Sequence, residues 1–190
     1  MTAAEPIRDQ KQLHRLAEYW FSRGNYRNYA LIVLGAHTAL RIGDLLRLKW
    51  NDVYDEKNER FRSHITLTER KTGKLHIIAL NVKAIEALNL CLTRRRGRYI
   101  FAGNRENEKP ISRVQAWRVI RAAAEAIKAA GRIACHSLRK TFGYFAWKMG
   151  IMPIMIMDLF NHSSFKITRR YLGITQDDRD AVYLNMALFN

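Results

Sequence analysis

Apolar positions at helical spacing mark the first fifty residues of the chain. Residues 8 to 23 and 26 to 39 both repeat apolar side chains three or four positions apart. Side chains at this spacing share one face of a helix, so each stretch predicts an amphipathic helix. The stretch RIGDLLRLKW, which starts at Arg41, keeps the same period and predicts a further helix with its leucines facing inward.

The apolar period changes from helical to alternating between residues 61 and 80. FRSHITLT, residues 61 to 68, alternates apolar and polar side chains, and LHIIAL, residues 75 to 80, is rich in residues that favour strands. ERKTGK lies between the two stretches and contains a glycine. The pattern predicts an antiparallel β-hairpin with this segment as its turn.

Helical spacing returns after Asn81 and continues, with turns, to the end. Ser112 and Gln115 match a capping box at the start of one helix, and Pro153 stands where the first turn of a helix tolerates proline. The predicted helices cover about residues 81 to 95, 112 to 130, 136 to 150, 153 to 160 and 175 to 190. The predicted fold class is α+β, mostly α: a helical domain with one small antiparallel sheet or hairpin near residues 50 to 80.

The composition points to a polyanionic partner. The chain has 33 Lys and Arg against 17 Asp and Glu, which gives a formal net charge of +16. A folded domain this basic repels itself unless a polyanion lies near, and nucleic acid is the usual reason. An acidic membrane surface is the competing partner, but no basic amphipathic anchor stands out, and the longest apolar run, residues 151 to 157, is too short to span a bilayer. We therefore expect a nucleic acid as the partner, and no membrane.

The cysteines, histidines and carboxylates do not match a metal site or a disulfide framework. Cys91 and Cys135 form no CxxC pair, and the six histidines show no HxxxH spacing. No paired carboxylates recur in a pattern that would hold two Mg²⁺ ions. We expect no metal and no cofactor. A reducing, cytoplasmic compartment fits the cysteines, and the polar opening residues do not form a signal peptide.

Cleaving a phosphodiester without metal ions requires fixed cations. Charge develops on the non-bridging oxygens, and the planar fork of arginine matches two of them. Arg41 lies among apolar residues in TALRIGDLLRL, and HSLR places His136 and Arg139 on one helical face. Lys71 lies at the tip of the predicted hairpin. Taken singly, Arg41 is as typical of an amphipathic helix as of a phosphate site, and the HSLR pair is also common on a solvated basic face. Lys71 alone is more typical of a turn in water.

The stretch LFNHSSFKITRRYLGI gathers bases around one tyrosine. Lys166, Arg169 and Arg170 come just before Tyr171, and His162 stands nine residues before it. Alone, Tyr171 is typical of a packing residue. The three bases are as typical of a solvated face as of contacts with flanking phosphates, which supply affinity rather than sequence reading.

In chain order, ALRIGDLLRL, KTGK, HSLRKTF and LFNHSSFKITRRYLGI resemble the catalytic domain of tyrosine recombinases, the phage integrase family. The resemblance covers about residues 10 to 175. It implies a site-specific enzyme that cuts DNA through a covalent 3′-phosphotyrosyl bond and leaves a free 5′-hydroxyl. A 5′-hydroxyl of the partner strand then attacks that bond, so the resemblance implies rejoining without metal or ATP.

The resemblance implies phosphate-binding roles for several of these residues. Arg41 and Arg139 would clamp the scissile phosphate. His136 would hydrogen-bond the phosphate and assist proton transfer from the tyrosine, and His162 would be a further phosphate donor. Asp44, three residues after Arg41, stands where the family usually has an acidic residue and would brace the site.

The remaining catalytic roles fall to a lysine and a tyrosine. Lys71 would be the general acid for the leaving 5′ oxygen, with Lys74 as the alternative; Lys71 is preferred because the family lysine precedes the turn. Tyr171 would be the nucleophile. Tyr144 and Tyr183 are the other candidates, but neither stands at the family spacing from His162.

The resemblance also implies an architecture and an assembly. We expect residues 1–190 to form a single catalytic domain without the family's N-terminal DNA-clamping domain, as either a fragment or a compact form like the fimbrial inversion recombinases. The tail, residues 175 to 190, would either dock on a neighbouring subunit to build a homotetramer on DNA or pack on its own domain. Asn161 replaces the family's usual glycine, and asparagine tolerates the left-handed conformation such a turn needs.

Two other functions share some of these features. A type IB topoisomerase has the same chemistry but relaxes supercoils without exchanging strands, and the compact size and short KTGK hairpin favour a recombinase. A non-catalytic DNA-binding regulator would not need a nucleophile at this spacing. The prediction is therefore a recombinase of the integrase, excisionase or invertase type.

Overall fold

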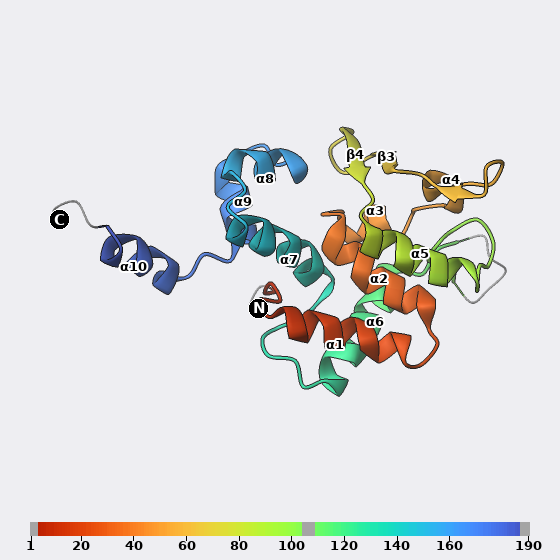
Figure 1. Cartoon of the computed structure of the whole chain (residues 1–190), viewed down its shortest axis with the longest axis horizontal. Helices are drawn as coiled ribbons and strands as arrows, with labels where there is room; N and C mark the ends of the chain where they lie inside the picture. Colours follow the sequence, from red (N-terminus) through yellow and green to blue (C-terminus); the bar gives the residue numbers. More distant parts are fainter. Residues whose placement is uncertain (1–3, 104–108, 187–190) are drawn as a thin grey trace.

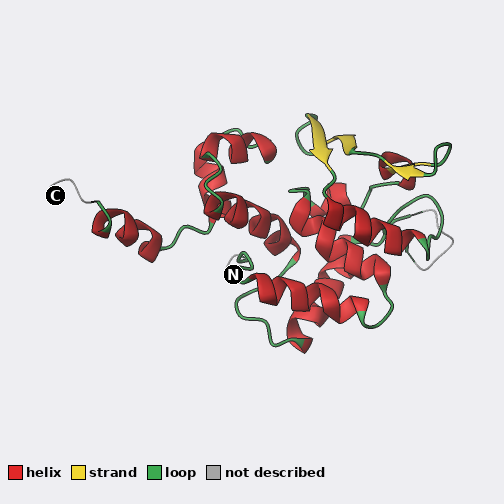
Figure 2. Cartoon of the chain, viewed as in Figure 1, coloured by secondary structure: helices red, strands yellow, loops and turns green. Residues whose placement is uncertain are grey.

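The fold is mostly helical, with two short strand pairs, in a computed structural model that describes residues 4–103 and 109–186. Helices make up most of the body, and both strand pairs lie along one edge of it (Figures 1 and 2). The helices are α1 (Gln10–Phe21), α2 (Tyr26–His37), α3 (Ile42–Leu45), α4 (Trp50–Val53), α5 (Val82–Leu92), α6 (Arg113–Ala126), α7 (Cys135–Lys148), α8 (Pro153–Leu159), α9 (Phe165–Leu172) and α10 (Gln176–Leu184). The strands are β1 (Tyr54–Asp55), β2 (Arg60–Phe61), β3 (His64–Thr68) and β4 (Leu75–Ala79).

Helix α2 forms the centre of the core. Its residues from Ala30 to Ala36 are all buried, and it packs against α1, α5 and α7. A helix that is apolar on every side belongs inside a domain, which is why the run YALIVLGA takes this place. Helices α7, α8 and α9 form a second, smaller cluster around Phe160 and Leu172, beside the main body (Figure 1).

The predicted hairpin is confirmed by the pairing of β3 with β4. The register runs from His64 opposite Ala79 to Thr68 opposite Leu75. A second antiparallel pair, β1 with β2, was not predicted, so the expectation of one sheet was wrong. Asp55 explains the second pair, because its carboxylate accepts the backbone N–H groups of Lys57 and Asn58 and closes the turn.

The expectation of one helix from Arg41 through RIGDLLRLKW was wrong, because the helix breaks after α3. The chain between α3 and α4 pairs with a distant segment instead: Lys49 forms a β-bridge with Tyr99, and the N–H of Ile100 bonds the carbonyl of Leu48 at 3.0 Å. This tertiary pairing outweighs the local helical period. As a result, Arg41 stands at the N-cap of a short helix rather than in the middle of a long one.

The other helices differ from prediction mainly at their ends. Ser112 and Gln115 form the predicted capping box of α6, and Pro153 opens α8. Helix α6 ends at Ala126 rather than near Ala130, because side chains of α1 bond the backbone beyond it; Gln12 bonds both the N–H and the carbonyl of Ala130.

Helix α9 was not predicted from the sequence. It ends at Gly173, whose φ of 64° is left-handed.

Gly143 sets how closely α7 approaches the other two helices of the small cluster. A Cβ at this position would lie 2.9 Å from two ring atoms of Phe160 and 3.1 Å from the backbone oxygen of Tyr171. Both distances are shorter than ordinary contacts, so any larger residue would displace α9 from α7. Gly143 therefore fixes the position of Tyr171.

We expect Gly143→Ala to destabilise the protein, although alanine is favoured over glycine in a helix by about 1 kcal/mol. Overpacking a core costs about 1–3 kcal/mol, and here the clash involves backbone that cannot rotate away. The net free energy of unfolding, measured by urea denaturation, should fall by about 1 kcal/mol or more. An unchanged or higher value would contradict the close packing of α7 and α9.

Candidate active site

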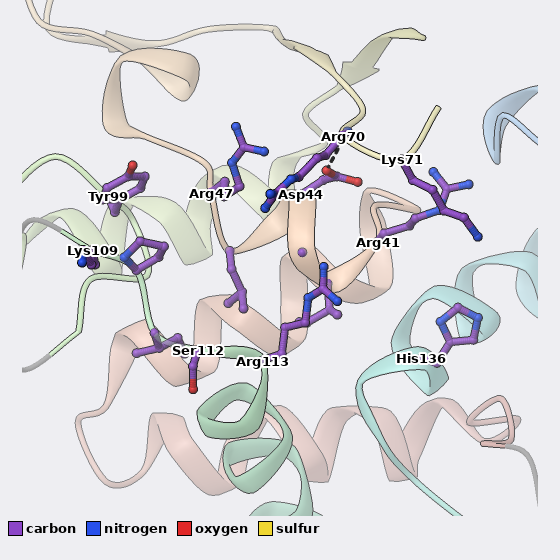
Figure 3. Close-up of a pocket in the computed structure, with 15 residues that line it drawn as sticks. Arg41, Asp44, Arg47, Arg70, Lys71, Tyr99, Lys109, Ser112, Arg113 and His136 are labelled. Atoms are coloured by element: carbon purple, nitrogen blue, oxygen red, sulfur yellow. Dashed lines mark hydrogen bonds between the residues drawn. The ribbon is translucent and has the colours of Figure 1, made fainter. Parts of the chain in front are cut away.

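The six candidate catalytic residues come from separate segments that converge at one place. Arg41 precedes α3, Lys71 lies in the turn between β3 and β4, and His136 and Arg139 lie on the first turns of α7. The loop after α8 carries His162, and the last turn of α9 carries Tyr171. Figure 3 shows Arg41, Lys71 and His136 along the same side of a cavity.

Tyr171 is held between three aromatic or imidazole rings. Its ring centroid lies 5.1 Å from that of Phe160, 4.7 Å from that of His162 and 5.0 Å from that of His136. The hydroxyl oxygen is 2.6 Å from Nε2 of His136, which is a short hydrogen bond. The packing fixes the ring, and the hydrogen bond fixes the direction of the hydroxyl.

Both histidines of the site are held neutral at pH 7. Burial of the ring, followed by the charges of Arg139, Lys140, Arg41 and Lys71, lowers the pKa of His136 to about 4, although the residue as a whole is exposed. Burial and the charges of Arg139 and Arg41 lower the pKa of His162 to about 4. A neutral imidazole with its proton on Nδ1 can accept the phenolic proton of Tyr171 at Nε2.

Arg139 is the buried cation that joins the parts of the site. Only 2% of it is exposed; Nη1 donates to the carbonyl of Ala39, and Nη2 donates to that of Phe160 at 2.7 Å. Its Nε has no partner among the described residues. Burial and the charge of Arg41 lower the pKa of Arg139 to about 10, so it stays charged at pH 7.

The two segments that meet Arg139 have unusual backbone. Ala39 has a φ of 56° and Asn161 a φ of 50°, both in the left-handed region that non-glycine residues seldom adopt. Asn161 thus adopts the conformation expected for it from the sequence. These turns aim the carbonyls of Ala39 and Phe160 at the guanidinium.

Glu69 is a site residue that the sequence reasoning missed. Its side chain is fully buried and forms an ion pair with Nη1 of Arg41. The carboxylate also accepts the hydroxyl of Thr72 at 2.8 Å. Burial alone would raise the pKa of Glu69, but the bonds from Thr72 and Arg41 outweigh it and lower the pKa, so the carboxylate is ionised. The alternation that buries Ile65 continues to position 69, and this pattern could have predicted that Glu69 is buried.

Asp44 lies beside this group, and its side chain contacts the hairpin, while its backbone N–H bonds the carbonyl of Arg41 at 2.9 Å. Its Oδ1 accepts the backbone N–H of Arg70 at 3.2 Å, and the side chain is buried. The bond connects α3 to the turn that carries Lys71. Asp44 therefore bridges two of the segments that form the site.

The cavity beside the site has a volume of about 830 Å³ and a cationic wall. Among the residues that line it, Asp44 is the one carboxylate, and the cations are Arg41, Arg47, Arg70, Lys71, Lys109 and Arg113. Figure 3 shows Arg47, Arg70 and Arg113 around the middle of the cavity. Such a wall favours a polyanion.

The alternative residues lie in different surroundings. Lys74 does not line the cavity, whereas Lys71 does. Tyr183 is 80% exposed on α10, and Tyr144 packs against Phe145. The three bases around the tyrosine, Lys166, Arg169 and Arg170, are exposed on α9.

The described residues include no candidate metal site and no candidate membrane span. Within residues 4–103 and 109–186, no group of three or more His, Cys, Asp and Glu is placed to hold a metal ion. In the same ranges, no helix is long and apolar enough to cross a membrane.

Comparison with known proteins gives consistent matches over nearly the whole chain. A sequence model described as "Phage integrase family" matches residues 8–177. The "Probable integrase/recombinase YoeC" of Bacillus subtilis is 35% identical over 184 residues, which are 96% of this chain and 97% of that protein. The "Tyrosine recombinase XerA" of Pyrococcus furiosus is 25% identical over 87% of this chain, but the match spans only 56% of XerA.

Solved structures show the same fold. The crystal structure of XerA recombinase superposes with a TM-score of 0.78 at 22% identity, over 100% of this chain and 66% of that one. A lambda integrase (75-356) dimer bound to a COC′ core site superposes with a TM-score of 0.70 at 20% identity, over 100% of this chain and 64% of that one.

We expect His136 and His162 to titrate near pH 4 in the free protein, because burial and neighbouring cations disfavour their charged forms. Since both pKa values lie below the ordinary 6.5, the stability that the neutral rings contribute is complete above about pH 6.5 and is lost as pH falls towards 4. Side-chain NMR titration measures the midpoints, and His136→Gln and His162→Gln assign the two signals. A midpoint at or above 6.5 for either ring would contradict the described environment.

Proposed function

The chain belongs to the phage integrase family, and we propose that it is a site-specific DNA recombinase that cuts and rejoins DNA through Tyr171. The observation that carries this proposal is the 2.6 Å hydrogen bond between the Tyr171 hydroxyl and His136. A packing tyrosine also bonds its hydroxyl when it is buried, but here the partner is a neutral imidazole among cations, which is the arrangement that a nucleophile and its base require. The chain spans about half the length of several tyrosine recombinases that it matches.

In the proposed first step, the Tyr171 oxygen attacks the scissile phosphorus and the bond to the 5′ oxygen breaks. The phenolic proton passes to Nε2 of His136, which is neutral and within hydrogen-bond reach. The product is a 3′-phosphotyrosyl bond and a free 5′-hydroxyl. One phosphoester replaces another, so the step balances without ATP or a metal ion.

The proposed charge stabilisation comes from Arg41, Arg139 and His162. Arg41 forms only one ion pair among the described residues, through Nη1, which leaves the rest of its guanidinium for a phosphate oxygen. His162 lies against the tyrosine ring and can donate from Nε2 when its Nδ1 accepts the hydroxyl of Thr168, 3.1 Å away. Fixed donors of this kind stabilise a phosphorane-like charge more than mobile water does.

Lys71 is the proposed general acid for the leaving 5′ oxygen. It lines the cavity together with Arg41 and His136, whereas Lys74 does not. A short turn between paired strands can bring the ammonium group to the leaving oxygen when DNA fills the cavity. Rejoining is the reverse: a 5′-hydroxyl of the partner strand attacks the phosphotyrosyl bond, and Lys71 takes its proton.

Double-stranded DNA is the proposed substrate because the site lies in a cationic surface. The chain carries a net charge of +16, and the cavity has six cations in its wall. The exposed Lys166, Arg169 and Arg170 are suited to contact phosphates that flank the cut. Such contacts make binding fall steeply with salt concentration.

We expect wild-type protein to form a covalent adduct with nicked suicide duplexes and Tyr171→Phe to form none, because phenylalanine lacks the attacking oxygen. A library of duplexes with randomised sequence removes the need to know the target, and denaturing electrophoresis separates the adducts. An adduct that persists in Tyr171→Phe would sink the assignment. Loss of the wild-type adduct in EDTA would overturn the metal-free scheme.

Lysine variants serve as matched controls in the same assay. Lys71→Ala should slow adduct formation by about 10²-fold or more, the usual effect of losing general acid catalysis. Lys74→Ala removes the same charge from the same hairpin and should react at close to the wild-type rate. Relaxation of a plasmid without any specific site would instead indicate a topoisomerase.

We further propose that the tail assembles the protein into a homotetramer on DNA. Helix α10 has no buried residue, and its apolar side chains Val182 and Leu184 are 58% and 84% exposed, as is Met186 just after the helix at 58%. The helix extends away from the body (Figure 1), to which the ion pair between Lys148 of α7 and Asp178 of α10 joins it at 2.6 Å. This arrangement fits docking on a second copy better than packing on its own domain. Met149, Met152 and Ile154, near the start of α8, are also exposed and give a second copy an apolar surface to meet.

We expect Leu184→Lys to abolish tetramers on nicked duplex without changing the unfolding temperature of the free monomer, because 84% of Leu184 is exposed to solvent. Sedimentation velocity measures the assembly. Asn185→Lys adds the same charge at the neighbouring position and should assemble normally. Tetramers formed by Leu184→Lys, or a lower unfolding temperature in that variant, would show that the tail does not act between subunits.

A further inference from the structure

Glu69 is a buried carboxylate in the midst of cations. Its side chain has no exposed surface, and it lies at the end of β3, where the strand enters the turn that carries Lys71. A buried charge without partners is very costly, so the partners of Glu69 show what it does. They are Arg41, by an ion pair, and Thr72, whose hydroxyl donates at 2.8 Å.

The backbone of Glu69 also closes the turn. Its N–H donates to the carbonyl of Lys74 at 2.9 Å, and its carbonyl accepts the N–H of Gly73 at 2.9 Å. Gly73 has a φ of 67°, which lets the turn close within these few residues. The backbone of Glu69 therefore fixes the turn that carries Lys71, the proposed general acid. Its side chain fixes Arg41, a proposed phosphate ligand.

The charge of Glu69 offsets a repulsion within the site. The charge of Arg41 lowers the pKa of Arg139, whereas the charge of Glu69 raises it. Before a phosphate arrives, Glu69 is thus a fixed negative charge near both arginines. His76, the nearest further titratable group, has its Nδ1 3.7 Å from Oε1, and its pKa is lowered by burial, so it adds no positive charge at pH 7.

We propose that Glu69 is a positioning residue that holds Arg41 and the Lys71 turn in one geometry before DNA binds. This inference rests on the proposed strand-cleavage activity of the site. Glu69 does not touch the phosphate; it acts through Arg41, using one terminal nitrogen and leaving the others for phosphate oxygens. It serves the reaction step rather than DNA affinity, because its own negative charge repels DNA.

The experiment compares Glu69→Gln with Glu125→Gln. Both remove one negative charge, but Glu125 is an exposed residue of α6 that pairs with Arg121. Single-turnover cleavage of saturating nicked duplex should slow at least tenfold in Glu69→Gln and stay unchanged in Glu125→Gln. The Kd for uncleavable duplex should be unchanged or tighter in Glu69→Gln, since the site becomes more positive. Glu69→Asp, which keeps the charge, should recover part of the rate.

Three results would overturn the inference. Unchanged cleavage by Glu69→Gln would mean that Arg41 needs no brace, and faster cleavage would mean that Glu69 competes with the phosphate. A loss of DNA affinity that accounts for the whole loss of rate would mean a general structural role. Failure of the proposed function is distinct from all three, because then the wild-type protein itself would form no adduct.

A second measurement does not depend on activity. Urea unfolding of Glu69→Gln, Arg41→Gln and the double variant forms a thermodynamic cycle. Each single variant leaves one buried or half-buried charge without its partner, whereas the double variant leaves two neutral amides. The losses in the free energy of unfolding should therefore be far from additive. Additive effects would show that the two residues do not act as a pair and would overturn the inference.

Discussion

The site depends on keeping Arg41 and Arg139 close together while no phosphate lies between them. Like charges at short range in a partly buried place repel strongly, and water cannot screen them there. The protein meets this repulsion with fixed groups: two carbonyls, from Ala39 and Phe160, accept from Arg139, and one buried carboxylate, Glu69, pairs with Arg41. These acceptors come from distant parts of the chain, so the core must fold before the cations can gather.

The position of the tyrosine follows from the same packing. Phe160 supplies a carbonyl to Arg139 and an aromatic ring to Tyr171, so the guanidinium and the phenol share one support. Gly143 lets α7 approach Phe160 closely. The left-handed conformation of Asn161 turns the chain after the end of α8. A change at Gly143 would therefore affect the tyrosine and Arg139 together.

Much of this arrangement was predictable from local pattern. The alternation around residues 61 to 80 predicted the hairpin, the capping box predicted the start of α6, and chain order suggested that Arg41, Lys71, His136, Arg139, His162 and Tyr171 belong to one site. The break between α3 and α4 was not predictable, because it depends on pairing Lys49 with Tyr99. Glu69 was missed because a charged residue beside a glycine turn normally faces water. Its burial depends on the ion pair with Arg41, which forms only in the folded protein.

The electrostatics of the free site also determine when its base becomes effective. Burial, and after it the charges of the neighbouring cations, lowers the pKa of His136 to about 4, which keeps the ring neutral and makes it a weak base. A phosphate placed among them adds negative charge, which raises the proton affinity of a neighbouring imidazole. In the proposed mechanism, His136 therefore becomes a stronger base when the scissile phosphorus comes within reach of the Tyr171 oxygen. The proposed proton removal and attack then depend on the same balance of charges, and the free site has little tendency to ionise Tyr171.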